Sequence, residues 1–259
     1  MNYLLLNYWN NFDFTDTVMV KDADVSEQGL VDYISIISSD GVKNDVMDES
    51  MDKFCGKMEC NGFSRKMFME LMDRYLYNPD SPYYDERIYG AFLKRMAKSN
   101  FIDEYSKSSL EFRLKLIERN NPGDVATQFT YYLVNGDERT LMNTDTKGNC
   151  MLVIFCDPLC DSCHKVMTEL TGNEALRKLV DDNKLTVLAV YTEGDEEAWR
   201  KSLKDIPRSW IVGTDRQGVK DKALYDLKAM PSLYFLSPDK KVMLKDTSPE
   251  ELVSIIGNL

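Results

Sequence analysis

Two cysteines separated by two residues, Cys160 and Cys163, form the part of the sequence best suited to chemistry. The apolar run 151–156 before them predicts a buried strand, and apolar residues at helical spacing after them predict a helix. The first cysteine then lies at a helix N-terminus, where free backbone N–H groups and the helix dipole stabilise a thiolate. Because the thiolate is the nucleophile in disulfide exchange, this arrangement predicts a redox-active dithiol.

Two metal-based alternatives share these residues. Cys160-Asp-Ser-Cys163-His164 matches the C-x-x-C-H pattern of c-type haem attachment, which would make the chain an electron-transfer protein. A haem would displace sheet packing here, so the strand-to-helix context favours the dithiol. A zinc site needs four ligands, and the sequence has neither a second C-x-x-C nor a pair of histidines. We therefore expect no metal and no organic cofactor, and we expect His164 either to tune Cys163 or to be exposed.

The elements that must position the dithiol follow a boundary at Asn120–Asp124. After it, strands are predicted at 128–134, 138–142, 184–191, 208–212, 232–236 and 241–245, with helices at 195–203, 218–227 and from Ser248. Asn135-Gly136 predicts a hairpin between the first two strands. The pattern predicts an α/β domain at 123–259, with a mixed sheet flanked by helices.

Residues 1–122 are predicted to form a separate, mainly α-helical domain. Four apolar stripes at helical spacing occur between residues 26 and 119, and a Met-rich stripe at 63–75 is one of them. Such stripes indicate core packing. The aromatic residues within 1–15 are expected to dock as an extended segment, and nothing in 16–119 suggests a catalytic arrangement.

The composition limits the possible partners and the location of the protein. A net charge of −11 and a pI of about 4.7 argue against nucleic acid or an anionic membrane as a partner. No apolar stretch is long enough to span a membrane. Residues 1–7 are too short, and lack the basic start, for a signal peptide. The protein is thus either cytosolic or exported with a signal outside this sequence.

The other four cysteines are not predicted to form disulfides with one another. Cys55 and Cys60 could be bridged if they lie in a loop, but in a straight helix their Cβ vectors would point apart. Free, buried thiols are the favoured interpretation. Cys150 and Cys156 lie on one predicted strand about 20 Å apart, so they cannot bridge each other, and both are expected in the core.

Three segments carry a resemblance to a known family: Pro122-Gly-Asp-Val-Ala-Thr-Gln-Phe129, the segment from Asp157 to His164, and Met-Pro-Ser-Leu-Tyr-Phe-Leu at 230–236. Residues 123–259 resemble the TlpA/ResA-like branch of the thioredoxin superfamily. The whole chain resembles two-domain cell-envelope proteins of Bacteroidetes, in which a helical domain of unknown function precedes the thioredoxin-like one. The resemblance implies a periplasmic protein whose signal or lipid-anchor segment lies outside this sequence.

The resemblance also implies roles for individual residues. Cys160 is the attacking thiol, Cys163 is the resolving thiol, and Pro231 is a cis-proline that faces them. A cis bond would leave the backbone of Met230 open to pair with a substrate segment. The alternative is an ordinary trans proline at a strand start, since only about 5–6% of X-Pro bonds in folded proteins are cis.

The sequence departs from the family at three places. Ile154 stands where thioredoxins have a buried Asp, Val166 where ResA-like proteins often have a Glu, and Asp161-Ser162 where thioredoxin has Gly-Pro. The general base is therefore water, Asp157 or Asp161, unless these acids only cap the helix or face solvent. A carboxylate next to the Cys160 thiolate opposes its ionisation, which predicts a mild, reducing dithiol.

These observations predict a protein thiol–disulfide oxidoreductase, more a reductase than an oxidase, that acts on partner proteins with disulfides or thiols. The resemblance implies a membrane electron donor. The alternative is a non-catalytic binding or scaffold protein of the cell envelope, in which the C-x-x-C holds a structural disulfide. The missing acids at the family positions favour that alternative.

Overall fold

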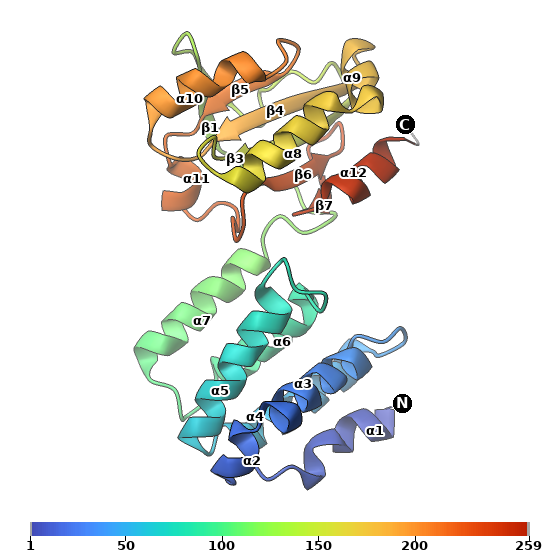
Figure 1. Cartoon of the computed structure of the whole chain (residues 1–259), viewed down its shortest axis with the longest axis vertical. Coiled ribbons are helices and arrows are strands. Elements are labelled where there is room, and N and C mark those ends of the chain that lie inside the picture. Colours follow the sequence, from blue (N-terminus) through green and yellow to red (C-terminus); the bar gives the residue numbers. More distant parts are fainter. Residues whose placement is uncertain (1, 258–259) are drawn as a thin grey trace. The chain divides into compact units, whose positions relative to one another are not determined.

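The structure, a computed structural model, describes residues 2–257 (Figure 1). The chain divides into two compact units between Ile117 and Glu118. Each unit has its own hydrophobic core. No helix within residues 2–257 is both long and apolar enough to cross a membrane.

The first unit is helical. It contains α1 (Asn2–Asn7), η1 (Tyr8–Asn11), α2 (Thr17–Lys21), α3 (Ala23–Ile37), α4 (Asn44–Met58), α5 (Gly62–Met72), η2 (Asp73–Tyr77), α6 (Glu86–Met96) and α7 (Glu104–Ile117). Acidic and amide side chains cap the N-termini of several helices. The side chains of Asp16, Asn61 and Asp85 each accept hydrogen bonds from two backbone N–H groups of the first turn. The predicted helical character of this region is confirmed.

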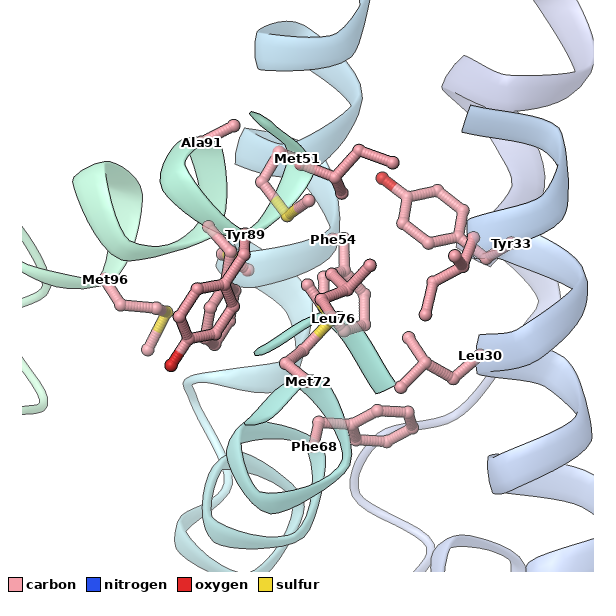
Figure 2. Packing of buried hydrophobic residues seen from close by; sticks show 14 of the residues in the cluster. Leu30, Tyr33, Met51, Phe54, Phe68, Met72, Leu76, Tyr89, Ala91 and Met96 are labelled. Atoms are coloured by element: carbon pink, nitrogen blue, oxygen red, sulfur yellow. The ribbon is translucent and has the colours of Figure 1, made fainter. Parts of the chain in front are cut away.

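The core of the first unit is aromatic and Met-rich, as the apolar stripes predict. Tyr33, Phe54 and Phe68 are completely buried, and Met51 and Met72 fill the space between helices (Figure 2). Burial of each such side chain stabilises the unit by about 1.5–3 kcal/mol.

The prediction of an extended segment at residues 1–15 is wrong. Residues 2–11 form α1 and η1 instead. Leu5 and Trp9 are four residues apart and both buried, whereas Tyr3 and Leu4 are exposed, so the segment has a helical apolar face. The aromatic content of the segment hid this spacing.

The second unit is a seven-stranded mixed sheet with helices. Its elements are β1 (Thr130–Leu133), β2 (Glu138–Thr140), β3 (Cys150–Cys156), α8 (Asp161–Gly172), α9 (Glu174–Asp181), β4 (Leu185–Tyr191), α10 (Glu196–Ser202), η3 (Leu203–Asp205), β5 (Ile211–Thr214), α11 (Gly218–Asp221), β6 (Ser232–Leu236), β7 (Val242–Lys245) and α12 (Pro249–Ile256). The strand order is β2-β1-β5-β4-β3-β6-β7. β3 is an inner strand, parallel to β4 and antiparallel to β6.

Both faces of β3 are buried, which explains its continuous apolar run. Leu152 and Ile154 face α8, α9 and α12, while Met151, Val153 and Phe155 belong to the cluster on the other face. Cys156, the last residue of β3, belongs to the same cluster as Cys163 in the first turn of α8, so both pack on this face of the sheet.

Two predicted elements differ from the structure. Predicted strand 208–212 begins only at Ile211, because the chain first turns, with Trp210 N–H bonded to the carbonyl of Pro207. Predicted helix 218–227 ends at Asp221, since Ala223 adopts the left-handed conformation. The hairpin at Asn135-Gly136 is confirmed.

The cysteines outside the C-x-x-C pair are free thiols. Cys55 is buried in α4 and Cys60 is exposed beyond its end, while Cys156 is buried and Cys150 is half-buried on β3. Burial raises the pKa of the Cys55 thiol, so it is unreactive where it lies.

Candidate functional site

A tight turn at 157–160 connects β3 to α8. The Asp157 carboxylate accepts the N–H of Leu159 at 2.9 Å, and the Asp157 carbonyl accepts the N–H of Cys160 at 3.1 Å. Cys160 is the N-cap residue of α8 and has extended backbone angles. The sequence thereby places a thiol at the positive end of a helix.

The two sulfurs of the pair have different environments. Cys160 is half-buried, and its thiol donates to the carbonyl of Met230 at 3.7 Å. Cys163 is 1% exposed, and its Sγ accepts the backbone N–H of Asp157 at 3.3 Å. Burial raises the pKa of the Cys163 thiol, and the Asp157 amide partly opposes this. Cys160 is thus the sulfur that a partner can reach.

The segment opposite Cys160 contains Met230 and Pro231, directly before β6. The peptide bond between these two residues is cis. The carbonyl of Met230 faces the Cys160 sulfur. The structure thus brings Cys160 and Cys163 close to a segment about 70 residues later in the chain.

The other residues that the sequence suggested lie around the first turn of α8. Asp161, Ser162 and His164 are exposed, while Asp157 is half-buried and uses its carboxylate in the turn. Ile154 is completely buried in the apolar cluster under α8. Which acid, if any, serves as general base remains a prediction.

A buried ionic cluster beside the Met230 segment was not predicted. The Lys228 Nζ lies 3.4 Å from Asp226 Oδ2 and 3.5 Å from Asp246 Oδ2, and all three side chains are at most 9% exposed. Ser232 donates to Asp246 Oδ1 at 2.7 Å. Asp226 and Lys228 stand close together in the sequence, but only the pairing of β6 with β7 brings Asp246 to them.

A cavity of about 540 Å³ opens beside Cys163. Its lining includes Cys156 from β3, Met167 from α8, Tyr191 from β4 and Trp199 from α10. Acidic and basic side chains of α10 and the residues after it lie around the apolar interior. The sequence pattern did not predict this cavity, because its walls come from six elements that are distant in the sequence: β3, α8, β4, α10, η3 and β5.

No cluster of His, Cys, Asp and Glu suited to a metal ion occurs among residues 2–257. The lone histidine, His164, is exposed on the helix that carries the dithiol.

Comparisons with known proteins agree with this architecture. The model of a domain of unknown function, DUF5106, matches residues 1–120. A thioredoxin-like protein from Bacteroides caccae is 31% identical in sequence, with a TM-score of 0.87 over 99% of this chain and 92% of that one. No curated protein matches the sequence.

Two further structures, both from Bacteroides fragilis, are similar to about half of this chain. The C-terminal domain of an uncharacterized protein is 30% identical, with a TM-score of 0.51 over 53% of this chain and 98% of that one. A conserved protein of unknown function is 33% identical, with a TM-score of 0.50 over 52% and 98% of the two chains.

Proposed function

Because this chain belongs to the thioredoxin-like family, we propose that it is a thiol–disulfide oxidoreductase that exchanges disulfides with partner proteins. One observation carries the proposal: a reachable thiol, Cys160, caps α8 while a buried thiol, Cys163, lies one turn further along the helix. This is the asymmetry that a two-step exchange requires, since one sulfur attacks and the other must wait.

In the first step, the Cys160 thiolate attacks a sulfur of a disulfide in the partner. A mixed disulfide forms, and the partner's other sulfur leaves as a thiolate that takes a proton. The helix N-terminus stabilises the Cys160 thiolate. The carbonyl of Met230, which accepts from the Cys160 thiol in the free protein, is available to pair with an extended segment of the partner.

In the second step, Cys163 loses its proton and attacks Cys160, which releases the reduced partner and leaves a Cys160–Cys163 disulfide. Two electrons move from the dithiol to the partner. The Asp157 amide, 3.3 Å from Cys163 Sγ, stabilises the thiolate as it forms. The same steps in reverse oxidise a partner.

The direction of electron flow is proposed to be reductive. Asp161 places a negative charge in the first turn of α8, next to Cys160. This charge disfavours the Cys160 thiolate. Because a dithiol is strongly oxidising when its reduced form is stabilised, the charge favours the reductive direction. A reductase needs a donor that restores the dithiol, and we propose a membrane reductase that meets this protein at the periplasmic face of the cell envelope.

A second function is a non-catalytic binding protein of the envelope. The observation in its favour is the apolar setting of Cys163: Ile154, completely buried beside it in the cluster under α8, carries no group that could take a proton. In that case Cys160 and Cys163 form only a structural disulfide.

Two experiments separate these functions. A Cys163→Ala variant should trap partners from envelope extracts as mixed disulfides at Cys160, whereas a matched variant that also carries Cys160→Ala should trap none. Absence of any trapped partner supports the binding protein. Titration of Cys160 and Cys163 against dithiol buffers should give a midpoint potential of about −270 mV, as in thioredoxin. A value of about −120 mV, typical of a strong oxidant, would contradict the reductive direction.

A further inference from the structure

Cys156 is a buried thiol that the two exchange steps do not use. It is the last residue of β3, is 8% exposed, and its Sγ lies 3.7 Å from the carbonyl of Val190. A free cysteine inside a sheet is ordinarily a small apolar core residue. Its location next to the dithiol sets this one apart.

The Cys163 sulfur lies against the backbone at the end of β3. Asp157, which directly follows Cys156, donates its N–H to Cys163 Sγ at 3.3 Å. The side chains of Cys156 and Cys163 belong to the same apolar cluster, which Cys160 also contacts. The two buried thiols are close enough for a charge on Cys156 to raise the pKa of Cys163, after the larger effect of burial. Three thiols therefore meet at this turn.

The cavity gives the buried sulfurs room to move. Cys156 and Cys163 both line the space of about 540 Å³ next to α8. In a close-packed interior, a new covalent bond requires neighbouring side chains to shift. Here a change of side-chain rotamer can use space that is already open. A disulfide then requires Cβ atoms within about 3.5–4.5 Å of each other and Cβ vectors that do not point apart.

We propose that Cys156 is a third thiol of the exchange site, which can take over the disulfide from Cys160. In the oxidised protein, the Cys156 thiolate attacks Cys163 Sγ. The Cys156–Cys163 bond forms as the Cys160–Cys163 bond breaks, and Cys160 leaves as a thiolate that takes up a proton. One disulfide is exchanged for another, so no oxidant or reductant is consumed.

The relocation changes what the oxidised protein can do. With the disulfide held between Cys156 and Cys163, Cys160 is a free nucleophile on the surface. A mixed disulfide formed at Cys160 then cannot be resolved by Cys163. It breaks when a thiolate of the partner attacks the partner's sulfur in that bond, which forms a new disulfide within the partner and releases Cys160 as a thiolate. This inference rests on the proposed function and extends it from reduction to isomerisation.

The rate of relocation should depend strongly on pH. Burial, with a smaller contribution from Asp157, raises the pKa of the Cys156 thiol to about 12. Only the deprotonated form attacks, and its fraction grows about tenfold per pH unit below that value. Relocation should therefore be slow at pH 7 and faster by about tenfold at pH 8.

The test is to alkylate the oxidised protein with iodoacetamide and map the products by mass spectrometry. We expect alkylated Cys160 together with a peptide pair linked through Cys156 and Cys163. In Cys156→Ala and Cys156→Val, whose folding is checked by circular dichroism, alkylation of oxidised Cys160 should be at least about tenfold slower. Equal alkylation in these variants, or no Cys156–Cys163 peptide in the wild-type protein, would overturn the proposal.

A second measurement does not require substitution of Cys156. Cys160→Ser, oxidised with diamide, should form the Cys156–Cys163 disulfide while the diamide is reduced to its hydrazine. An unlinked pair of thiols after this treatment contradicts the proposal. Neither measurement uses turnover, and reduction of insulin by the reduced wild-type protein tests the proposed function by itself, so each can fail independently.

Discussion

Residue type and position together set the environments of the two thiols of the C-x-x-C pair. Cys160 can be recognised from the sequence as a helix N-cap because the strand, the turn residues and the helical spacing are all local signals. The burial of Cys163 follows from its place on the inner side of the first turn of α8, against Asp157. Local pattern therefore predicts the placement of this pair at the start of α8, whereas its catalytic role stays a prediction.

Asp161 provides the first prediction at this scale. Asp161→Ser removes a negative charge beside Cys160 and should stabilise its thiolate. Alkylation of reduced Cys160 at pH 7 should become about two- to fivefold faster, and the midpoint potential should become less negative. The effect is small because Asp161 is exposed and solvent screens its charge.

Salt and a charge-conserving variant provide the controls for Asp161. The difference between Asp161→Ser and wild type should shrink in 1 M NaCl, where charges are screened within about 3 Å. Asp161→Glu should behave as the wild type does. An Asp161→Ser variant that alkylates at the wild-type rate at low salt would contradict the repulsion.

Lys228 shows where inference from single residues ends. Its partners Asp226 and Asp246 lie on either side of the hairpin formed by β6 and β7. No local pattern indicates that the side chain of this lysine is 3% exposed between two carboxylates. Only the strand pairing reveals the cluster.

At the scale of elements, the Lys228 cluster connects the segment before β6 to the end of β7. Lys228→Met leaves the buried Asp226 and Asp246 carboxylates without this cation, which should cost about 3–5 kcal/mol of unfolding free energy. Urea unfolding followed by circular dichroism measures the loss. Lys228→Arg keeps the charge and should lose less. Equal stability of Lys228→Met and wild type would show that the cluster does not hold this segment.

Gly213 in β5 predicts a different kind of loss. A Cβ at this position would come within 2.6 Å of the Tyr131 ring and 3.0 Å of the Tyr132 carbonyl. Gly213→Ala should therefore push β1 away from β5 and destabilise the second unit by about 1–3 kcal/mol. The unfolding midpoint in urea measures the effect.

Gly172 is a matched control for Gly213. It ends α8, and a Cβ there would meet no atom within 4 Å. Gly172→Ala should leave stability unchanged or raise it by about 0.5–1 kcal/mol, because Ala favours a helix more than Gly does. If Gly213→Ala and Gly172→Ala were equally stable, the close contacts at Gly213 would not limit the stability of the second unit.

Hydrophobic periodicity predicted long elements better than short ones. The continuous apolar runs predicted β3 and β4 to within one residue, and cap residues followed by acids in the first turn predicted α10 and α12. The errors fall on α11 and β5, each of four residues, where a turn or one left-handed residue outweighs a short pattern. The prediction for segment 2–11 was wrong for another reason. Its many aromatic residues suggested an extended segment and obscured the helical spacing of Leu5 and Trp9.

At the scale of the whole molecule, the predicted class is confirmed: a helical unit precedes a thioredoxin-like one, and the resemblance inferred from three motifs holds for the full chain. The cores do not share residues. Since each unit buries its own apolar surface, a change of solution conditions can act on the two units unequally.

Glu59 gives the first unit an acid-sensitive ion pair. Its carboxylate lies 2.6 Å from Arg95 Nη2, and its side chain is 9% exposed. Burial, the largest single effect, raises the pKa of Glu59, but the hydrogen bonds from Arg95 and Ser99 and the charge of Arg95 together outweigh it, so the pKa is lowered. A group with a lowered folded-state pKa contributes stability above its unfolded value, and this contribution is lost as the pH falls through the folded value.

Acidification from pH 7 to pH 3 should therefore weaken the helical unit through Glu59. Hydrogen exchange followed by mass spectrometry reports on the peptides of each unit separately, and α4 and α6 should lose protection as the acid titrates. Glu59→Gln should lower the stability of this unit at pH 7 by about 1–3 kcal/mol, the cost of an unmet hydrogen bond to a charged group, and should flatten its pH dependence. If Glu59→Gln kept the wild-type slope, the acid sensitivity would have to arise from other carboxylates, because removal of this one removes its proton linkage.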